Sequence, residues 1–420
     1  MTEIIELFPG MTLRCVQDSR FKQGCLSFQL IRQMDAGEAA LNALLPAVLL
    51  RGTKQHPDLR SVTEHLDQLY GASVSTLVRR VGDYQTVGLY CGFMDDRFAL
   101  PGDRVLVPMI DFLRELLLCP LVENGAFLPE IVESEKKNLI ATIEAERNDK
   151  RAYAMGQLLK TMCRGDSFGL PRLGEKEQVA AITPSALYDH FQKILRESPI
   201  ELFYVGSRES SEIARLLRPV FAELDRAVRP LQPQTGFHSC EGCYRVETLD
   251  VAQGKLCIGY TTPITNRCPK FPAMQLFNTI FGAGMTSKLF VNIREKLSLC
   301  YSVGSGYYGT KGIVTVSAGI DFDKEELTRQ EVQRQLEACQ RGEITDAELR
   351  SAREALLSSL RATHDSPGSI EGYYATAALS GMGMTPEEYM AAVRAVTREQ
   401  VVAAANSLSL HTTYFLKGGY

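Results

Sequence analysis

The chain repeats the order of its segments at a distance of about 210 to 220 residues, which is about one long domain. The correspondences are residues 133–149 with 350–366, residues 181–183 with 395–397, and residues 203–206 with 414–418. The first of them runs without a gap. We therefore predict a chain made of two copies of one unit in tandem.

Each copy combines short alternating runs, typical of strands, with longer stretches of helical periodicity. The expected strands are residues 12–16, 25–31, 73–79, 86–93 and 200–206 in the first copy, and 255–260, 301–308 and 312–320 in the second. The expected helices are 104–118, 129–147, 271–281 and 289–297. Turn residues predict hairpins from 12–16 to 25–31 and from 73–79 to 86–93. The fold class is α+β, with antiparallel sheets packed with helices.

A Pro- and Gly-rich stretch marks the connection between the copies. It begins at Arg229 and contains Pro230, Pro233 and Gly236. We place the first domain at residues 1–228, a linker at 229–253 and the second domain at 254–420.

Composition and charge narrow the class of protein. With 420 residues, 45% of them hydrophobic and 23% charged, the chain has the composition of a globular protein with two cores. A net charge of −4 gives no basic footprint for nucleic acid or an anionic membrane. The start of the sequence lacks the pattern of a signal peptide, and no apolar run reaches the length of a membrane span. We expect a cytoplasmic protein that binds neither nucleic acid nor membrane.

The 11 cysteines lie scattered, mostly in apolar segments where a thiol packs as a small hydrophobe. One close pair, Cys240 and Cys243, follows His238 in the connecting stretch. A structural zinc site needs four ligands, and the sequence has no second C-x-x-C to complete one. We favour a pair without metal or redox function, and leave its role open.

An apolar segment at residues 42–53 ends in Arg51-Gly52-Thr53. Asp35 and Glu38, three residues apart, have the spacing of a capping box ahead of it. A second amphipathic helix is expected at residues 61–72, ending at Gly71.

This succession resembles the first domain of the insulinase/pitrilysin family of zinc peptidases. The resemblance implies two tandem homologous α/β roll domains that face each other across a chamber. In active members the first helix carries H-x-x-E-H, whose His residues hold Zn²⁺ while the Glu activates water. The equivalent positions here are Ala43, Pro46 and Ala47, which can neither bind a metal nor move a proton.

A second segment agrees with this loss. Active relatives supply a third ligand, a Glu on the long helix seven residues after another acidic residue. Glu135 keeps the earlier position, and the ligand position falls on Thr142. We therefore expect no metal, no cofactor and no peptidase activity. His56 with Glu64 and His65 is the one candidate for a replacement cluster, but we favour a solvated helix surface there.

The second domain keeps more of the family pattern. Residues 281–303 resemble G-G-x-x-S-x-L-F…R-E-x-x-x-L-x-Y-x-V, whose Arg and Tyr contact the substrate backbone in active members. Those positions are Arg294 and Tyr301. The alternative is that Arg294 pairs with Glu295 and Tyr301 packs in the sheet.

These features lead to one hypothesis with two alternatives. The chain is expected to be the non-zinc subunit of a heterodimeric processing peptidase, or a homodimer, that helps to bind peptide or unfolded polypeptide. Its partner would be an active H-x-x-E-H paralogue. The alternatives are a scaffold or accessory protein that binds no peptide, which fits a weaker resemblance to an elongation-factor modification pathway, and a hydrolase with a relocated metal.

Overall fold

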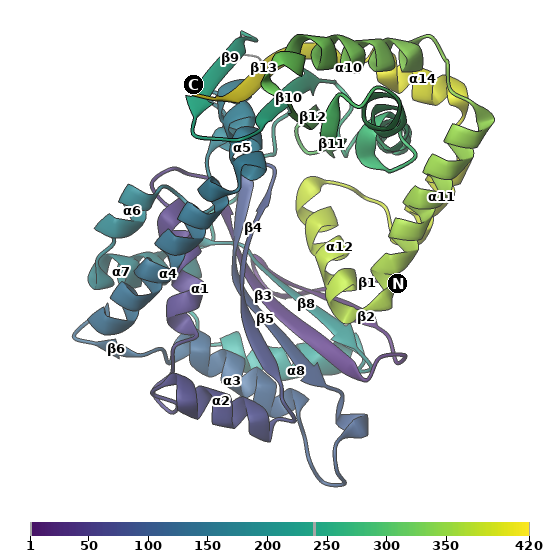
Figure 1. Cartoon of the computed structure of the whole chain (residues 1–420). Helices are drawn as coiled ribbons and strands as arrows, with labels where there is room; N and C mark the ends of the chain where they lie inside the picture. Colours follow the sequence, from purple (N-terminus) through teal and green to yellow (C-terminus); the bar gives the residue numbers. More distant parts are fainter. Residues whose placement is uncertain (1, 238–240, 420) are drawn as a thin grey trace. The chain divides into compact units, whose positions relative to one another are not determined.

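The computed structural model describes residues 2–237 and 241–419, and its chain divides into two compact units (Figure 1). The first unit contains residues 1–144, 170–233 and 364–376. The second contains residues 145–169, 234–363 and 377–420. Of the pair Cys240 and Cys243, Cys240 lies outside the described residues, as does His238.

The first unit is built on a six-stranded sheet in the order β1-β2-β8-β3-β5-β4. The strands are β1 Thr2–Phe8, β2 Met11–Gln17, β3 Gln23–Gln33, β4 Ser73–Val81, β5 Tyr84–Met94 and β8 Ile200–Gly206. β2 and β8 run parallel, and the other neighbours are antiparallel. β6 Val122–Glu123 and β7 Ala126–Phe127 form a separate short pair.

Helices cover the face of this sheet that carries its main apolar core. They are α1 Ala39–Leu49, α2 Leu59–Gln68, α3 Leu106–Leu118, α4 Pro129–Asn148, α6 Lys176–Ala181, α7 Pro184–Glu197 and α8 Ser210–Phe221. β3 alternates its side chains between the faces. Leu26, Phe28 and Leu30 enter the main apolar core, to which α1, α3, α7 and α8 contribute.

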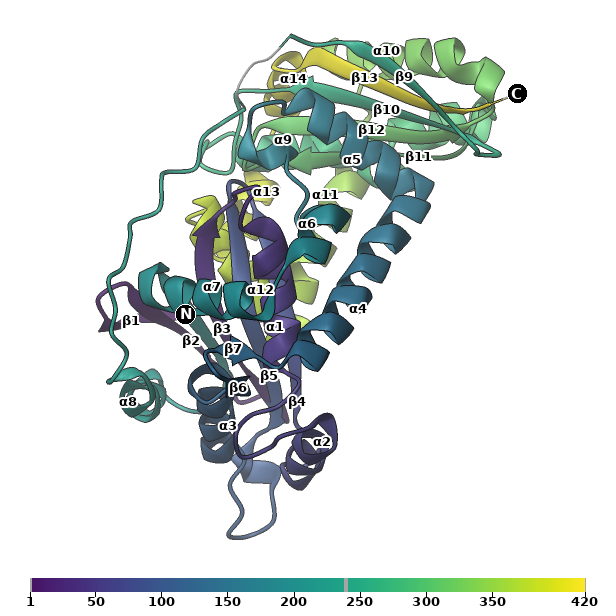
Figure 2. The same cartoon turned by 90° about the vertical axis from the view of Figure 1, so that its left-hand side faces the viewer.

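The second unit is built on a five-stranded sheet in the order β11-β12-β10-β13-β9. The strands are β9 Tyr244–Leu249, β10 Gly254–Thr261, β11 Cys300–Tyr308, β12 Ile313–Ile320 and β13 Ser409–Gly418. The helices are α5 Lys150–Met162, α9 Phe271–Asn278, α10 Glu325–Gln340, α11 Asp346–Ala362, α13 Pro386–Ala395 and α14 Arg398–Asn406. Figure 2 shows α5 on one face of this sheet and α10 and α14 on the other.

The two sheets have the same topology, which confirms the α+β prediction. The second sheet, taken from its other edge, runs β9-β13-β10-β12-β11, and the first runs β2-β8-β3-β5-β4 after β1. The single parallel pair occupies the same place in both, as β2 with β8 and as β13 with β9. The repeat in the sequence is therefore a repeat of sheet topology. No helix among the described residues is long and apolar enough to cross a membrane.

The two units exchange a helix. α5 follows α4 in the first half of the sequence, but residues 145–169 belong to the second unit. α12, Pro367–Ser380, follows α11 in the second half, and its first part belongs to the first unit. In the repeat, α4 and α5 correspond to α11 and α12. Each sheet therefore has one face covered by a helix from the other copy.

The α12 helix is held on the first sheet by a buried carboxylate. Glu371 is 1% exposed, and its oxygens accept hydrogen bonds from Ser27 Oγ and Gln29 Nε2, both at 2.8 Å. The guanidinium of Arg79 forms an ion pair with the same carboxylate at 2.8 Å. A buried charge is tolerated when it is paired and fully hydrogen-bonded.

The loop after α5 is held in the second unit in a similar way. Lys311, in the turn between β11 and β12, is 1% exposed. Its Nζ lies 2.9 Å from Asp166 Oδ1 and donates to Thr235 Oγ1 at 3.2 Å. The lysine side chain is 0% exposed and that of the aspartate 2%, so neither charge is solvated by water.

The structure corrects the first predicted hairpin. β2 and β3 are separate strands as expected, but β8 lies between them in the sheet. β8 pairs parallel with β2 and antiparallel with β3. The turn residues between β2 and β3 do not form a hairpin, because the strand that pairs with both of them, β8, follows about 190 residues later in the chain. The second predicted hairpin, β4 with β5, is confirmed.

The structure also corrects the expected capping box. The side chain of Glu38 makes no cap hydrogen bond to α1. It forms ion pairs with Arg32 and Lys193 instead, both at 2.7 Å. Asp35 accepts a hydrogen bond from the backbone N–H of Gly37. The two carboxylates stabilise the approach to α1, but not by capping it.

The division into units differs from the sequence-based boundaries of 1–228, 229–253 and 254–420. Strand β9 lies inside the stretch expected as a linker. Residues 145–169 and 364–376 each belong to the unit that the sequence order did not indicate.

Breaking the Lys311–Asp166 pair is expected to destabilise the protein strongly. Lys311→Met leaves the Asp166 carboxylate buried without its cation, which costs about 3–5 kcal/mol of unfolding free energy. The double variant Lys311→Met, Asp166→Asn removes both charges and keeps an acceptor for the Phe168 N–H, so most of the loss is recovered. Urea denaturation measures each value.

The matched control for this prediction is Lys324→Met, which removes a lysine from an exposed ion pair with Asp321. Its unfolding midpoint is expected to stay near that of the wild type. If Lys311→Met were as stable as the control, the buried pair would not hold the loop after α5.

Candidate functional site

Helix α1 carries the three residues that the sequence places at the H-x-x-E-H positions. Ala43 is 8% exposed, Pro46 is buried and Ala47 is partly exposed. Their side chains hold no nitrogen, oxygen or sulfur atom. Among the described residues, no three His, Cys, Asp or Glu side chains lie so that they could hold a metal ion.

The third position lies on α4. Thr142 is exposed, and its hydroxyl donates to the backbone oxygen of Asn138 at 3.0 Å, within its own helix. Glu135, one of the acidic residues that α4 does carry, is buried and forms an ion pair with Arg51 at 2.7 Å. That pair joins the end of α1 to α4. The carboxylate therefore serves packing within the first unit.

A buried polar network lies beside α1, and the sequence analysis missed it. Asn42 is 0% exposed and donates from Nδ2 to Gln85 Oε1 at 2.8 Å. Its Oδ1 lies 2.7 Å from His190 Nε2. Burial lowers the pKa of His190 to about 4, so the imidazole is neutral at pH 7. A single Asn inside the apolar run of α1 was the available signal, because a buried amide requires partners.

The positions of His56 and His65 differ from the expected solvated helix surface. Their rings lie 4.4 Å apart, and both contact the ring of Phe112. His56 Nε2 is 3.8 Å from Glu115 Oε2. Burial, with a smaller effect of His56, lowers the pKa of His65. The pair packs between α2 and α3 and is not a solvated helix surface.

Glu64, which the sequence analysis grouped with these histidines, does not share their packed environment. It is exposed and pairs with Arg60 at 2.8 Å. For Glu64 the expectation of a solvated helix surface is therefore correct.

The second unit brings Arg294 and Tyr301 to one cavity. Both line a space of about 420 Å³ together with Ser298 and Lys324. Arg294 lies on a π-helical segment, Leu289–Lys296. Ser298 has a φ of 50°, a left-handed conformation that costs a non-glycine residue about 1–2 kcal/mol. The strained turn joins the segment that carries Arg294 to the strand that carries Tyr301.

The guanidinium of Arg294 is only loosely held. It lies over the ring of Phe290, with 4.7 Å from Cζ to the ring centroid. Its Nε is 3.7 Å from Glu295 Oε1, which is the pairing considered as an alternative. With 42% of the side chain exposed, the group can reach a ligand without leaving the stacked position.

Tyr301 projects outward because β11 is irregular at this point. Cys300 pairs with Ile320 and Ser302 with Gly319, which leaves Tyr301 as an extra residue in the ladder. Its side chain is 63% exposed and does not pack in the sheet. The hydroxyl donates to Asp321 Oδ1 at 3.2 Å. Bulges of this kind turn a side chain away from its regular direction.

Comparison with known sequences identifies relatives. A family model described as "Peptidase M16 inactive domain" matches residues 181–356. The protein named "Probable inactive metalloprotease YmfF" of Bacillus subtilis (strain 168) is 30% identical over 409 residues, which cover 97% of this chain and 96% of that protein. An "Uncharacterized zinc protease" of Rickettsia bellii (strain RML369-C) is 24% identical over 301 residues, covering 70% of this chain and 71% of the relative.

Solved structures share the fold. A conserved protein from Enterococcus faecalis V583 has a TM-score of 0.91 at 26% identity, with 100% of this chain and 99% of that chain covered. The peptidase M16 inactive domain from Pseudomonas fluorescens has a TM-score of 0.82 at 16% identity, with 100% and 98% covered. The second likeness is one of fold alone.

Two copies of one α+β unit, with alanine at both His positions and proline at the Glu position of the expected H-x-x-E-H, define a peptidase-like protein that lacks the family's zinc-binding motif. The chain belongs to the peptidase M16 family, the insulinase/pitrilysin family that its sequence resembles. It is an inactive member of that family.

Restoring α1 alone is expected to leave the protein without peptidase activity. The variant Ala43→His, Pro46→Glu, Ala47→His supplies two imidazoles and a general base, but Thr142 leaves the metal one protein ligand short. Adding Thr142→Glu is expected to tighten zinc binding. Zinc titration by calorimetry and a chelator-sensitive peptidase assay measure both variants, and thermal unfolding establishes that they are folded. Efficient turnover by the triple variant would contradict the assignment of Thr142.

Proposed function

We propose that this protein is the non-zinc subunit of a heterodimeric processing peptidase, acting in the cytoplasm beside an active H-x-x-E-H paralogue. In this role its second unit binds the polypeptide substrate. The observation that carries the proposal is that Arg294 and Tyr301 line one cavity with partly exposed side chains.

The chemistry of the two side chains supports a peptide ligand. A guanidinium and a phenol are both hydrogen-bond donors, suited to a carbonyl oxygen or to the oxyanion that forms when water attacks a peptide bond. Arg294 has one weak ion pair and Tyr301 one hydrogen bond to an exposed carboxylate. A ligand carbonyl can replace either partner at low cost, because these exposed contacts are weak.

A site shared between two subunits explains why this chain would keep one half of it without the other. In the family the zinc ligands belong to the first domain and the Arg and Tyr to the second. A chain with no metal ligand at Ala43, Ala47 or Thr142 and no general base at Pro46 still supplies the second half, and a partner with H-x-x-E-H supplies the first. A homodimer of this chain would lack the zinc half in both copies.

A scaffold or accessory role is the second candidate function, including one in an elongation-factor modification pathway. It is favoured by the internal partners that both side chains have, Glu295 and Phe290 for Arg294 and Asp321 for Tyr301. In that case the cavity is a by-product of the fold and binds no peptide.

The two candidates differ in what happens to the partner's rate. Arg294→Ala or Tyr301→Phe is expected to lower peptide turnover by the reconstituted pair about 10²-fold, the usual effect of losing one oxyanion donor. The control Arg334→Ala removes an exposed arginine of α10 and is expected to leave the rate unchanged. Size-exclusion chromatography verifies that each variant still assembles. Normal assembly with an unchanged rate in both variants would favour the scaffold role.

A further inference from the structure

A cavity of about 300 Å³ in the first unit lies where the end of β3, the approach to α1 and the end of α7 meet. Residues 229–232 of the connecting stretch also line it. The backbone N–H of Arg229 donates to the carbonyl oxygen of Glu197 at 2.8 Å, which attaches this stretch to the last residue of α7. All of the lining residues belong to the first unit.

The cations that line this cavity already have partners. Arg32 and Lys193 both form ion pairs with the Glu38 carboxylate, each at 2.7 Å. The guanidinium of Arg229 lies 2.7 Å from Glu197 Oε1. These three positive charges are therefore not available to an anionic ligand without loss of an existing ion pair.

The acceptors on the same walls do not all have donors. Gln33 Oε1 and Glu197 Oε2 are buried, and neither accepts a hydrogen bond from any group that the structure describes. Burying an acceptor without a donor costs free energy. The Asp35 carboxylate accepts the backbone N–H of Gly37 but pairs with no cation among the described residues. The cavity therefore offers free acceptors and a negative charge.

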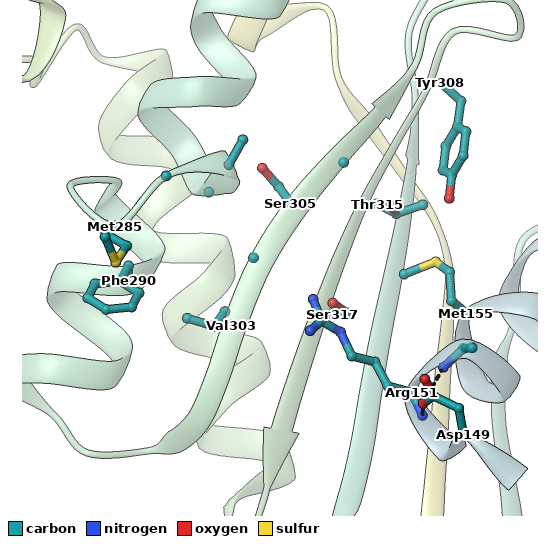
Figure 3. A pocket seen from close by; sticks show the side chains of 16 residues that line it. Asp149, Arg151, Met155, Met285, Phe290, Val303, Ser305, Tyr308, Thr315 and Ser317 are labelled. Carbon is teal, nitrogen blue, oxygen red and sulfur yellow. Dashed lines mark hydrogen bonds between the residues drawn. The ribbon is translucent and has the colours of Figure 1, made fainter. Parts of the chain in front are cut away.

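A larger cavity in the second unit does not have this property. It has a volume of about 720 Å³ and lies beside β11 and β12 (Figure 3). Figure 3 shows its carboxylate, that of Asp149, hydrogen-bonded to the backbone N–H groups of Arg151 and Ala152 at the start of α5. None of the described residues that line it carries a buried side-chain nitrogen or oxygen without a hydrogen-bond partner. The need for a donor is thus a property of the smaller cavity and does not follow from volume.

The chemistry of the smaller cavity selects an organic cation. Among the described residues, no three His, Cys, Asp or Glu side chains could hold a metal ion together. A primary ammonium has three N–H donors and no acceptor, which matches the free oxygens. Glu197 ends α7, and the C-terminal end of a helix carries a partial negative charge that favours a nearby cation. Ile31, Pro199 and Leu231 add apolar lining.

We propose that this cavity binds a primary ammonium that is attached to a short aliphatic body. The ammonium donates hydrogen bonds to Gln33 Oε1 and Glu197 Oε2, and the Asp35 carboxylate balances its charge. Hydrogen bonds from a charged donor are stronger than those between neutral groups. The aliphatic carbons contact the apolar lining. This site lies in the first unit and uses neither Arg294 nor Tyr301, so it goes beyond the proposed function.

Two variants remove one part of the site each. Gln33→Met removes an acceptor that has no donor within the protein, so the free variant is expected to unfold at the same urea concentration as the wild type or at a slightly higher one. Asp35→Asn removes the charge and keeps an oxygen for the Gly37 N–H. The matched control is Asp225→Asn, at an exposed carboxylate of the first unit that does not line the cavity.

Three probes separate charge from hydrogen bonding: butylammonium, tetramethylammonium, which has the charge but no N–H donor, and 1-butanol, which has no charge. Calorimetric titration is expected to show butylammonium binding about tenfold or more tightly than either of the others. Gln33→Met is expected to weaken butylammonium about tenfold, the scale of one hydrogen bond to a charged group. Asp35→Asn is expected to weaken it about threefold, since an exposed charge contributes less. Asp225→Asn is expected to have no effect.

A lysine side chain carries the same ammonium as a free amine, and a fourth probe, Nα-acetyl-lysine amide, separates the two sources. Tighter binding of this probe than of butylammonium, weakened by Gln33→Met, would support the site and assign its ligand to a polypeptide. Tighter binding of butylammonium would support the site and assign its ligand to a free amine.

Three results would overturn the ammonium site: no saturable binding of butylammonium or of the lysine derivative, equal binding of tetramethylammonium, or unchanged binding in Gln33→Met. The urea midpoint of Gln33→Met establishes that a loss of binding is not a loss of folding. None of these results bears on the proposed function, which is tested by the partner's rate in the Arg294 and Tyr301 variants.

Discussion

A buried carboxylate or ammonium is stable only where its partners are already in place, and both sheets of this protein depend on such a contact. The Glu371 carboxylate needs Ser27, Gln29 and Arg79 on the first sheet. The Lys311 ammonium needs Asp166 from the loop after α5. In each case the two partners come from different halves of the sequence. A cut between residues 228 and 254 would therefore separate each of these charges from its partner and each sheet from one of its helices.

In the first unit, helix α1, which carries the H-x-x-E-H positions, serves packing. The interior of α1 is alanine, leucine, valine and proline around a single amide, Asn42, whose hydrogen bonds go to Gln85 and His190. The imidazole nearest to α1 is buried, neutral and hydrogen-bonded, so it is not presented to solvent as a ligand. The second unit differs. Tyr301 and Arg294 are exposed, so packing in a core does not explain their presence. The bulge at Tyr301 and the left-handed conformation of Ser298 both shape the chain around the cavity that these side chains line.

Sequence patterns predicted the parts of this structure that depend on local order. The strands 73–79, 86–93 and 200–206 and the long helix 129–147 were placed nearly as β4, β5, β8 and α4. The family followed from short motifs. What the sequence did not predict depends on distant partners: β8 between β2 and β3, β9 beside β13, and the exchange of α5 and α12. The contact of His56 with His65 was missed for the same reason, since a loop residue and a helix residue share no periodicity.

The central claim is that the zinc half of the family's site is gone from this chain. Native mass spectrometry of the purified protein, after dialysis against excess zinc and then buffer, tests it most directly. An H-x-x-E-H relative treated in the same way is the positive control. We expect the mass of the metal-free chain and no cleavage of peptides. One bound zinc per chain, removed by a chelator together with a peptidase activity, would contradict it.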